Sequence, residues 1–344
     1  MHDRLLAVLQ SIADVRLIAA LKDDRIGCPG ANDLRVFVPD IHLLSQDRQA
    51  SFQYGTNHAD LLTTVLIALK KLRRQAVPNG TLGFYVMGDL FDLWREALSS
   101  IAEDTAACIR DSHEDLMAAL LDPDLGVQFL LGNHDIELYR WPAYRAWERR
   151  YYLCDSATSA PRVIILHGDI FDWIECFPDQ LQQVVVYFSP VAPTSYQLGE
   201  LADLAERGER GRDYASCIQA PQPLALGKFK RLANEPIPVR WNVPPTGVGP
   251  EEGCRFLDAA CREAAKANQQ FGLDLRMAVI GHTHQARIAV KEDAGTFFAL
   301  VDCGAWIEQC TWLEDGQAIT APNAQLAALC DNEIRIYQLA PLSS

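Results

Sequence analysis

The stretch LGFYVMGDLFD (residues 82–92) begins as an apolar run and ends in polar residues, with two aspartates among them. Continuous apolar runs of four to six residues are typical of strands buried on both faces of a sheet. Four other segments have the same organisation: LRVFVPDIH (34–42), VQFLLGNHD (127–135), RVIILHGD (162–169) and RMAVIGHTH (276–284). We therefore expect five buried strands, each followed by a polar loop.

Helical patterns separate the early strands. They are HADLLTTVLIALKKLRRQAV (58–77) and EDTAACIRDSHEDLMAALL (103–121). Alternation of strands and helices predicts crossover connections and a layered α/β domain. After residue 284, the segments ARIAV, TFFALVDCGAW and EIRIYQLA follow one another without a long helix. We expect them to be neighbouring antiparallel strands that complete a second sheet, so that two packed sheets are flanked by helices.

We predict one domain over residues 1–344, with two additions. The apolar positions of the first 24 residues recur at helical spacing, which predicts an N-terminal helical extension over residues 1–30. Residues 171–270 contain a proline-rich segment (220–253) between helical patterns at 178–208 and 251–270. Long insertions in compact domains are often functional, so we expect a cap over the site; a structural elaboration is the alternative.

Composition and charge limit the class of protein. The chain of 344 residues has 31 Lys and Arg against 45 Asp and Glu, a net charge of −14, which argues against broad nucleic-acid binding. No signal peptide and no membrane-spanning window is recognisable, although a peripheral membrane contact stays open. The ten cysteines contain no C-x-x-C pair, which favours reduced thiols over a cysteine zinc site. We expect a cytoplasmic protein of undetermined oligomeric state.

Five of the eight histidines directly follow predicted strands: residues 42, 134, 167, 282 and 284. Any one of them could be a hydrogen-bonded structural residue, and Gly132-Asn133-His134-Asp135 alone could be an ordinary turn. Ligands of open α/β sheets, however, bind at the carboxyl ends of the strands. Five histidines at such positions, each beside Asp, Asn or Gly, favour a functional site.

The candidate metal ligands combine imidazoles with oxygen donors. Asp40 and His42 are two residues apart and should point the same way at a strand end. The full candidate set is Asp40, His42, Asp89, Asn133, His167, His282 and His284. Such mixed ligands suit Mn²⁺, Fe or Zn²⁺ better than Mg²⁺ or Ca²⁺. Seven ligands suffice for two ions bridged by one carboxylate, for which we select Asp89. Two ions about 3.5–4 Å apart clamp a phosphoryl group and convert a shared water into the attacking hydroxide.

Five motifs in order carry a resemblance: D-x-H (40–42), G-D-x-x-D (88–92), G-N-H-D (132–135), H-G-D (167–169) and G-H-T-H (281–284). Over roughly residues 34–306, the chain resembles the calcineurin-like metallophosphoesterase superfamily. The resemblance implies a four-layer αββα sandwich and a metal-dependent phosphoester hydrolase. We expect two divalent transition-metal ions, with Mn²⁺ favoured and Fe or Zn²⁺ as alternatives.

The resemblance also implies a role for each motif residue. The first ion would be held by Asp40, His42, Asp89 and His284, and the second by Asp89, Asn133, His167 and His282. His134 would face the substrate and stabilise or protonate the leaving oxygen. Asp92 would orient its imidazole, as a carboxylate commonly orients a catalytic histidine.

A finer resemblance concerns the substrate. The segments GDLFDLW (88–94) and VDCGAWIEQCTWLEDG (301–316) are similar to bacterial UDP-2,3-diacylglucosamine pyrophosphatases and their relatives, which carry a helical cap. Those pyrophosphatases usually have Arg at the position of His134, and the relatives have Asn and Asp at the positions of Asp302 and Ala305. We expect a phosphodiester or a nucleotide- or lipid-linked pyrophosphate as substrate.

Other functions remain as alternatives. They are a phosphomonoesterase acting on small molecules or proteins, a nuclease and a non-catalytic scaffold. The acidic charge argues against the nuclease, and the complete ligand set argues against the scaffold.

Five further residues are candidates for contact with the substrate: Arg95, Asp135, Lys228, Lys230 and Arg231. Each has a simpler interpretation. Arg95 could form an exposed salt bridge, and Asp135 could be a turn carboxylate. The three basic residues at 228–231 could lie on a solvated helix face.

Overall fold

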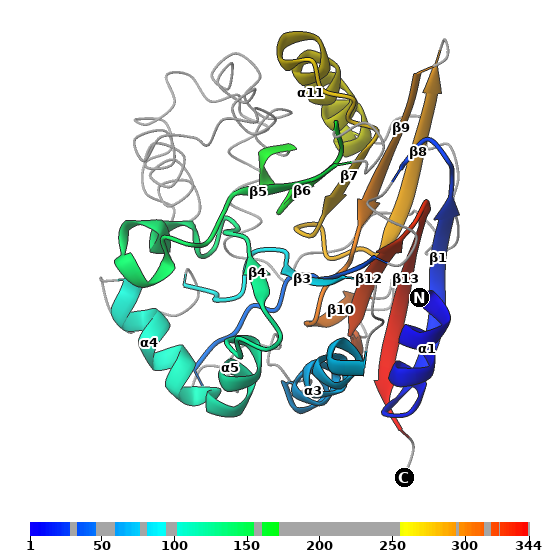
Figure 1. The fold of residues 1–344 in the computed structure, drawn as a ribbon. Helices are drawn as coiled ribbons and strands as arrows, with labels where there is room; N and C mark the ends of the chain where they lie inside the picture. Colours follow the sequence, from blue (N-terminus) through cyan, green and yellow to red (C-terminus); the bar gives the residue numbers. More distant parts are fainter. Residues whose placement is uncertain are drawn as a thin grey trace.

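Two mixed sheets lie between layers of helices (Figure 1). The computed structural model describes residues 1–27, 33–45, 59–75, 81–93, 102–154, 160–171, 255–293, 296–312, 318–322 and 324–342. Within these ranges, no helix has the length and apolar character needed to cross a membrane.

The first sheet has six strands, and the last three of them in spatial order are parallel. In spatial order they are β1 (Ala13–Lys22), β13 (Glu333–Pro341), β12 (Gln325–Cys330), β2 (Leu34–Val38), β3 (Leu82–Val86) and β4 (Val127–Phe129). Strands β2, β3 and β4 run parallel, whereas β12, β13 and β1 pair antiparallel. The parallel part places the loops after β2, β3 and β4 at one edge of the sheet.

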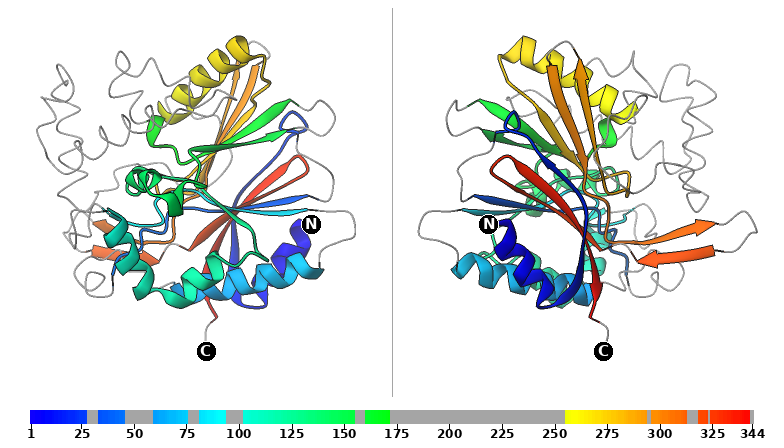
Figure 2. Two further views of the ribbon diagram at one scale, coloured as in Figure 1. Left: turned by 60° about the vertical axis from the view of Figure 1, so that its left-hand side comes forward. Right: turned by 90° about the vertical axis from the view of Figure 1, so that its right-hand side faces the viewer.

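The second sheet has five strands with a parallel centre of its own. In spatial order they are β5 (Arg150–Cys154), β6 (Pro161–Leu166), β7 (Met277–Ile280), β9 (Thr296–Asp302) and β8 (Arg287–Asp293). Strands β6, β7 and β9 are parallel, and the edge strands β5 and β8 are antiparallel to their neighbours. A separate antiparallel pair, β10 (Glu308–Trp312) and β11 (Ala318–Pro322), extends away from both sheets (Figure 2).

Helices cover the outer faces of the sheets, which completes four layers (Figure 2). The six-stranded sheet is covered by α1 (His2–Gln10), α3 (Ala59–Gln75), α4 (Ala102–Ser112) and α5 (Glu114–Leu120). Helix α11 (Arg255–Phe271) packs against β8 and β9 of the other sheet. Two short 3₁₀ helices, η1 (Ile136–Arg140) and η2 (Pro142–Tyr144), follow β4. The predicted four-layer αββα arrangement is confirmed.

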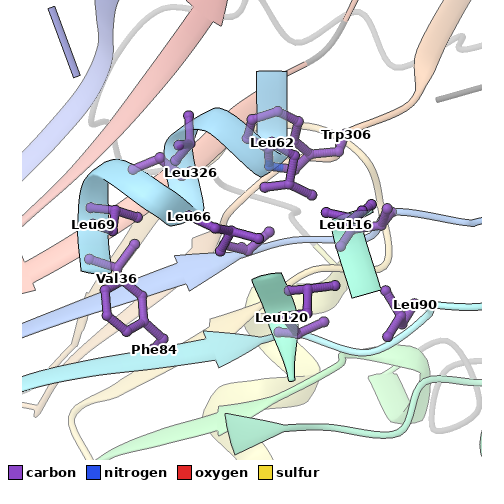
Figure 3. Close-up of a cluster of buried hydrophobic side chains, with 14 of the residues drawn as sticks. Val36, Leu62, Leu66, Leu69, Phe84, Leu90, Leu116, Leu120, Trp306 and Leu326 are labelled. Atoms are coloured by element: carbon purple, nitrogen blue, oxygen red, sulfur yellow. The ribbon is translucent and has the colours of Figure 1, made fainter. Parts of the chain in front are cut away.

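The apolar strands are buried on both faces, as their composition predicts. Along β2 and β3, Val36 and Phe84 face the helices, where they join Leu66 of α3 (Figure 3). The next residues, Phe37 and Tyr85, face the second sheet and stack with ring centroids 5.4 Å apart. This alternation follows from the two-residue period of a strand. Because both faces are packed, the loops at the strand ends are held rigidly.

The N-terminal region differs from the predicted helical extension. Helix α1 ends at Gln10, and β1 then pairs with β13, the last strand of the chain, from Ala13↔Pro341 to Lys22↔Glu333. Strand β13 offers β1 a long row of backbone hydrogen-bond partners, which the spacing of apolar residues in the first 24 residues cannot reveal. In addition, the β-branched residues Val15 and Ile18 favour an extended backbone. Strand formation therefore prevails over the helical spacing.

Two other predictions, one on a strand and one on a helix, also differ from the structure. The segment EIRIYQLA (333–340) lies in β13 and so joins the first sheet, not the second. The helix predicted over residues 103–121 is two helices that meet at His113, whose Nε2 hydrogen-bonds the Leu44 carbonyl oxygen at 2.7 Å.

Most of the predicted cap, residues 172–254, lies outside the described residues. The cap therefore stays a prediction.

Candidate metal centre

The predicted ligands, together with Asp92 and His134, all lie in loops after strands of the two sheets. Asp40 and His42 follow β2, Asp89 and Asp92 follow β3, Asn133 and His134 follow β4, His167 follows β6, and His282 and His284 follow β7. Three sets of donor atoms lie within 4.8 Å of one another: Asp40 with His42 and His284, His42 with Asp89 and His134, and Asp89 with His167 and His282. The loops of the two sheets thus converge on a single centre.

The first group contains Asp40, His42 and His284. Nε2 of His42 lies 3.1 Å from Nε2 of His284, which is itself 3.1 Å from Oδ2 of Asp40. Nε2 of His42 and Oδ2 of Asp40 are 4.0 Å apart. Three donor atoms from the loops after β2 and β7 therefore surround one point.

A second group contains Asn133, His167 and His282. Oδ1 of Asn133 is 2.9 Å from Nε2 of His167 and 3.1 Å from Nδ1 of His282. The two imidazole nitrogens are 3.3 Å apart. The other nitrogen of His167, Nδ1, lies 3.0 Å from the Met87 carbonyl oxygen, which fixes the orientation of the ring.

Asp89 lies between the two groups. Its Oδ2 is 3.1 Å from Nε2 of His167 and 3.6 Å from Nε2 of His42. Its Oδ1 accepts a hydrogen bond from the backbone N–H of His134 at 2.8 Å. One carboxylate oxygen is therefore fixed by the backbone, and the other faces both groups, as a bridging ligand requires.

The donor atoms fit two divalent ions. Two ligand atoms about 2.1 Å from one ion, at tetrahedral or octahedral angles, lie about 3.0–3.4 Å apart. Most of the separations within the groups are close to this range, and the largest is the 4.0 Å between His42 and Asp40. Oδ1 of Asp40 is buried and accepts no hydrogen bond in the described structure, although Nδ1 of His167 lies 3.6 Å away. Burying this charged oxygen without a hydrogen bond is costly, and a bound cation would offset that cost. Imidazole nitrogens mixed with carboxylate and amide oxygens suit first-row transition metals.

The backbone of the ligand loops is strained. Of the five described non-glycine residues with positive φ, four are predicted ligands: His42, Asp89, His282 and His284, with φ between 49° and 69°. A side chain in this left-handed region costs energy, and such residues concentrate at functional sites. The packed sheets beneath the loops supply the stability that maintains this conformation.

The motif glycines make room for the carboxylates. A Cβ atom at Gly132 would lie 2.0 Å from Oδ1 of Asp89, and one at Gly281 would lie 2.1 Å from Oδ1 of Asp40. Only glycine therefore allows these loops to approach the acidic ligands so closely.

Burial and charge set the protonation of the metal-free centre. Burial lowers the pKa of His42 to about 4, although its contact with Asp92 opposes the shift. Burial also acts to lower the pKa of His167, but the carboxylates of Asp89 and Asp40 outweigh it and raise this pKa to about 10. The pKa of Asp89 is lowered, because nearby imidazoles outweigh its burial. Metal binding would require His167 to release its proton.

His134 and Asp92 form a pair beside the metal ligands. Nδ1 of His134 lies 2.8 Å from Oδ1 of Asp92. The Asp92 side chain is fully buried, whereas that of His134 is 11% exposed. Because Asp92 engages Nδ1, the opposite ring nitrogen, Nε2, is the one that can face a substrate.

Asp135 occupies a different position from the predicted substrate contact. Its side chain is fully buried and accepts backbone hydrogen bonds from Gly132 at 2.8 Å, Leu90 at 2.9 Å and Phe91 at 3.4 Å. Burial, together with the charge of Asp89, raises its pKa to about 7. The structure therefore places Asp135 as a support that joins the loops after β3 and β4, because a substrate cannot reach a buried carboxylate.

Two contacts of the centre were missed by the sequence reasoning. The hydroxyl of Thr283, between His282 and His284, donates a hydrogen bond to the buried Asp302. Arg149 forms a buried ion pair with Asp169, 2.8 Å from Nη2 to Oδ2. Asp169 belongs to the H-G-D motif, but nothing in the spacing of Arg149 indicates its partner. The remaining candidates, Arg95, Lys228, Lys230 and Arg231, lie outside the described residues.

Comparison with known proteins gives one result. The sequence model of the family described as calcineurin-like phosphoesterase matches residues 36–286, a range that contains all five motifs. A comparison with curated proteins gave no match.

Proposed function

The chain belongs to the calcineurin-like phosphoesterase family and is a metal-dependent phosphoesterase, and we propose that it uses two divalent ions to hydrolyse a phosphodiester or a nucleotide- or lipid-linked pyrophosphate. One observation carries the proposal of two ions: Oδ2 of Asp89 faces both His42, at 3.6 Å, and His167, at 3.1 Å. A single-ion site would not need a carboxylate between two separate groups of donors.

The proposed ligand sets follow the two groups. Asp40, His42, Asp89 and His284 would hold the first ion, and Asp89, Asn133, His167 and His282 would hold the second. A pair of bound ions polarises phosphoryl oxygens and lowers the pKa of a coordinated water. The imidazoles, which make up half of each set, favour a first-row transition metal over Mg²⁺ or Ca²⁺. Among these metals we favour Mn²⁺, with Fe or Zn²⁺ as alternatives.

His134 acts on the leaving group in this proposal. Its Nδ1 contacts Asp92, so Nε2 is directed away from that carboxylate and donates a proton to the leaving oxygen. Asp92 keeps the imidazole in one orientation and stabilises its protonated form. Both side chains are held by the packed loops after β3 and β4, which keeps the proton close to the reacting bond.

The histidine bears on the substrate class. An alkoxide is a poor leaving group and needs a proton, whereas a phosphate leaving group needs less assistance. His134 therefore supports a phosphodiester, and the segments at 88–94 and 301–316 support a pyrophosphate, because they resemble the diacylglucosamine pyrophosphatases. A phosphomonoester is the second candidate, favoured by the same histidine.

A panel of substrates with Mn²⁺ tests the proposal. A phosphodiester, a nucleotide pyrophosphate, a phosphomonoester and single-stranded DNA are compared at equal concentrations. We expect the diester or the pyrophosphate to be hydrolysed fastest and DNA to be inert, since the chain carries a net charge of −14. Faster hydrolysis of the monoester would replace the proposed substrate class with the second candidate. Inertness towards all four would contradict the proposed substrates.

A further inference from the structure

The chain crosses from one sheet to the other directly beside the second group of ligands. Glu148 pairs with the end of β4, since its N–H bonds the Phe129 carbonyl oxygen at 3.0 Å and its carbonyl oxygen accepts the Leu131 N–H at 2.9 Å. Two residues later, Arg150 begins β5 and pairs with Leu166 of β6. Arg149 therefore stands at the crossing point between the six-stranded and the five-stranded sheet.

The side chain of Arg149 joins the loops of both sheets. Its Nη1 donates to the Leu131 carbonyl oxygen at 2.6 Å, and its Nη2 donates to both oxygens of Asp169, at 3.0 and 2.8 Å. Arg149 is only 3% exposed and Asp169 only 5% exposed. A buried ion pair with several good hydrogen bonds needs a reason, because apolar residues commonly fill such space at lower cost.

The positions of its two partners suggest that reason. Leu131 lies two residues before Asn133, and Asp169 lies two residues after His167. Asn133 and His167 come from different sheets, yet Oδ1 and Nε2 approach to 2.9 Å. We propose that Arg149 is a positioning residue that holds these two loops at the separation needed by one of the two ions. This inference rests on the proposed dinuclear centre.

The contacts of Arg149 with Leu131 and Asp169, here called the tether, require an arginine and concern one group of ligands. A planar guanidinium presents separate nitrogens to the carbonyl oxygen and to the carboxylate, whereas a lysine offers one nitrogen for both. Through Leu131 and Asp169, Arg149 connects the loops after β4 and β6. It does not connect the loops after β2 and β7, which supply Asp40 and His284. The second ion therefore depends on Arg149 more than the first ion does.

The test is a calorimetric titration of the metal-free full chain with Mn²⁺. Arg149→Lys keeps the charge opposite Asp169 but loses the planar fork. We expect one of the two ions to bind within about twofold of the wild-type affinity and the other to bind about 10–100-fold more weakly, the usual effect of losing a partner behind the ligands. Arg162→Lys is the matched control, because Arg162 lies on β6 and pairs with the partly exposed Asp274 at 3.2 Å. The control should bind both equivalents normally.

Two variants keep the proposal falsifiable if one of them fails to fold. Asp169→Asn removes the charge but keeps one acceptor for Arg149, and it should also weaken the binding of one of the two ions selectively. Wild-type affinity for both ions in a folded variant, or equal weakening of both, would overturn the tether. Failure of the wild-type chain to bind two ions would instead overturn the proposed centre, and the tether with it.

Discussion

Oδ1 of Asp92 lies 2.8 Å from Nδ1 of His134, the proposed proton donor of the centre. The other oxygen, Oδ2, lies 3.1 Å from Nδ1 of His42, a proposed ligand of the first ion. The two imidazoles meet edge to face, with ring centroids 4.6 Å apart. One buried carboxylate therefore orients both a metal ligand and a group that acts on the substrate.

Replacing His134 should separate catalysis from metal binding. His134→Ala removes the proposed proton donor but no proposed ligand, so turnover should fall about 10²–10⁴-fold while two Mn²⁺ ions still bind. Steady-state kinetics on the best substrate of the panel, with calorimetry for the ions, makes the measurement. Normal turnover would show that His134 has another role.

Replacing Asp92 should affect both functions. In Asp92→Asn one oxygen becomes an amide N–H₂, which cannot accept a hydrogen bond from an imidazole. Turnover should fall as in His134→Ala, and the Mn²⁺ ion held by His42 should bind about 10–100-fold more weakly through the loss of support for this ligand. If metal affinity were unchanged, Asp92 would support His134 alone.

Replacing Asp135 should reduce stability. Asp135→Ala leaves the buried N–H groups of Gly132, Leu90 and Phe91 without their acceptor, at about 1–3 kcal/mol each. The free energy of unfolding of the metal-free protein should fall by about 3 kcal/mol or more in urea titrations. Asp111→Ala, on the exposed surface of α4, is the control and should change it by less than about 0.5 kcal/mol. A similarly small change in Asp135→Ala would contradict the role of a support.

Asp302 should give the metal-free protein a characteristic pH dependence. Burial raises its pKa from 3.8 to about 7, so the folded state holds the proton more tightly than the unfolded state. The protonated Asp302 carboxyl therefore contributes up to about 4 kcal/mol to the free energy of unfolding below about pH 4. This contribution is lost as the pH rises to about 7.

Asp302→Asn removes this titration. Unfolding free energies of the wild type and the variant, measured in urea from pH 4 to 8 with a chelator, should therefore diverge with pH. The wild type should lose stability relative to the variant as the pH rises. Parallel curves would show that Asp302 does not titrate in this window.

The sequence predicts the layers well and places the candidate ligands at the ends of strands, because both depend on local patterns. Runs such as VIIL before His167 indicate buried strands, and the carboxyl end of a parallel strand is where ligands gather. Two ligands separated by one residue, as in His282 and His284, require no knowledge of distant contacts. The convergence of the loops then follows from the parallel strands.

Long-range pairings could not be predicted in the same way. Strand β1 forms because β13 lies beside it, and the two are more than 300 residues apart in the chain. The bond from Arg149 to Asp169 likewise depends on how the two sheets face each other. The position of Asp135 in its motif predicted a substrate contact. Its buried carboxylate instead accepts hydrogen bonds, partly from its own loop and partly from the loop after β3.

The central claim is that Asp89 bridges two ions, and the number of bound ions tests it most directly. Metal-free protein is titrated with Mn²⁺ by calorimetry, with Asp89→Ala alongside. We predict two ions per wild-type chain and a weaker affinity for both ions in the variant, because Oδ2 of Asp89 faces His42 and His167 alike. Saturation of the wild-type chain with one ion or none, or normal binding of two ions by Asp89→Ala, would contradict the account.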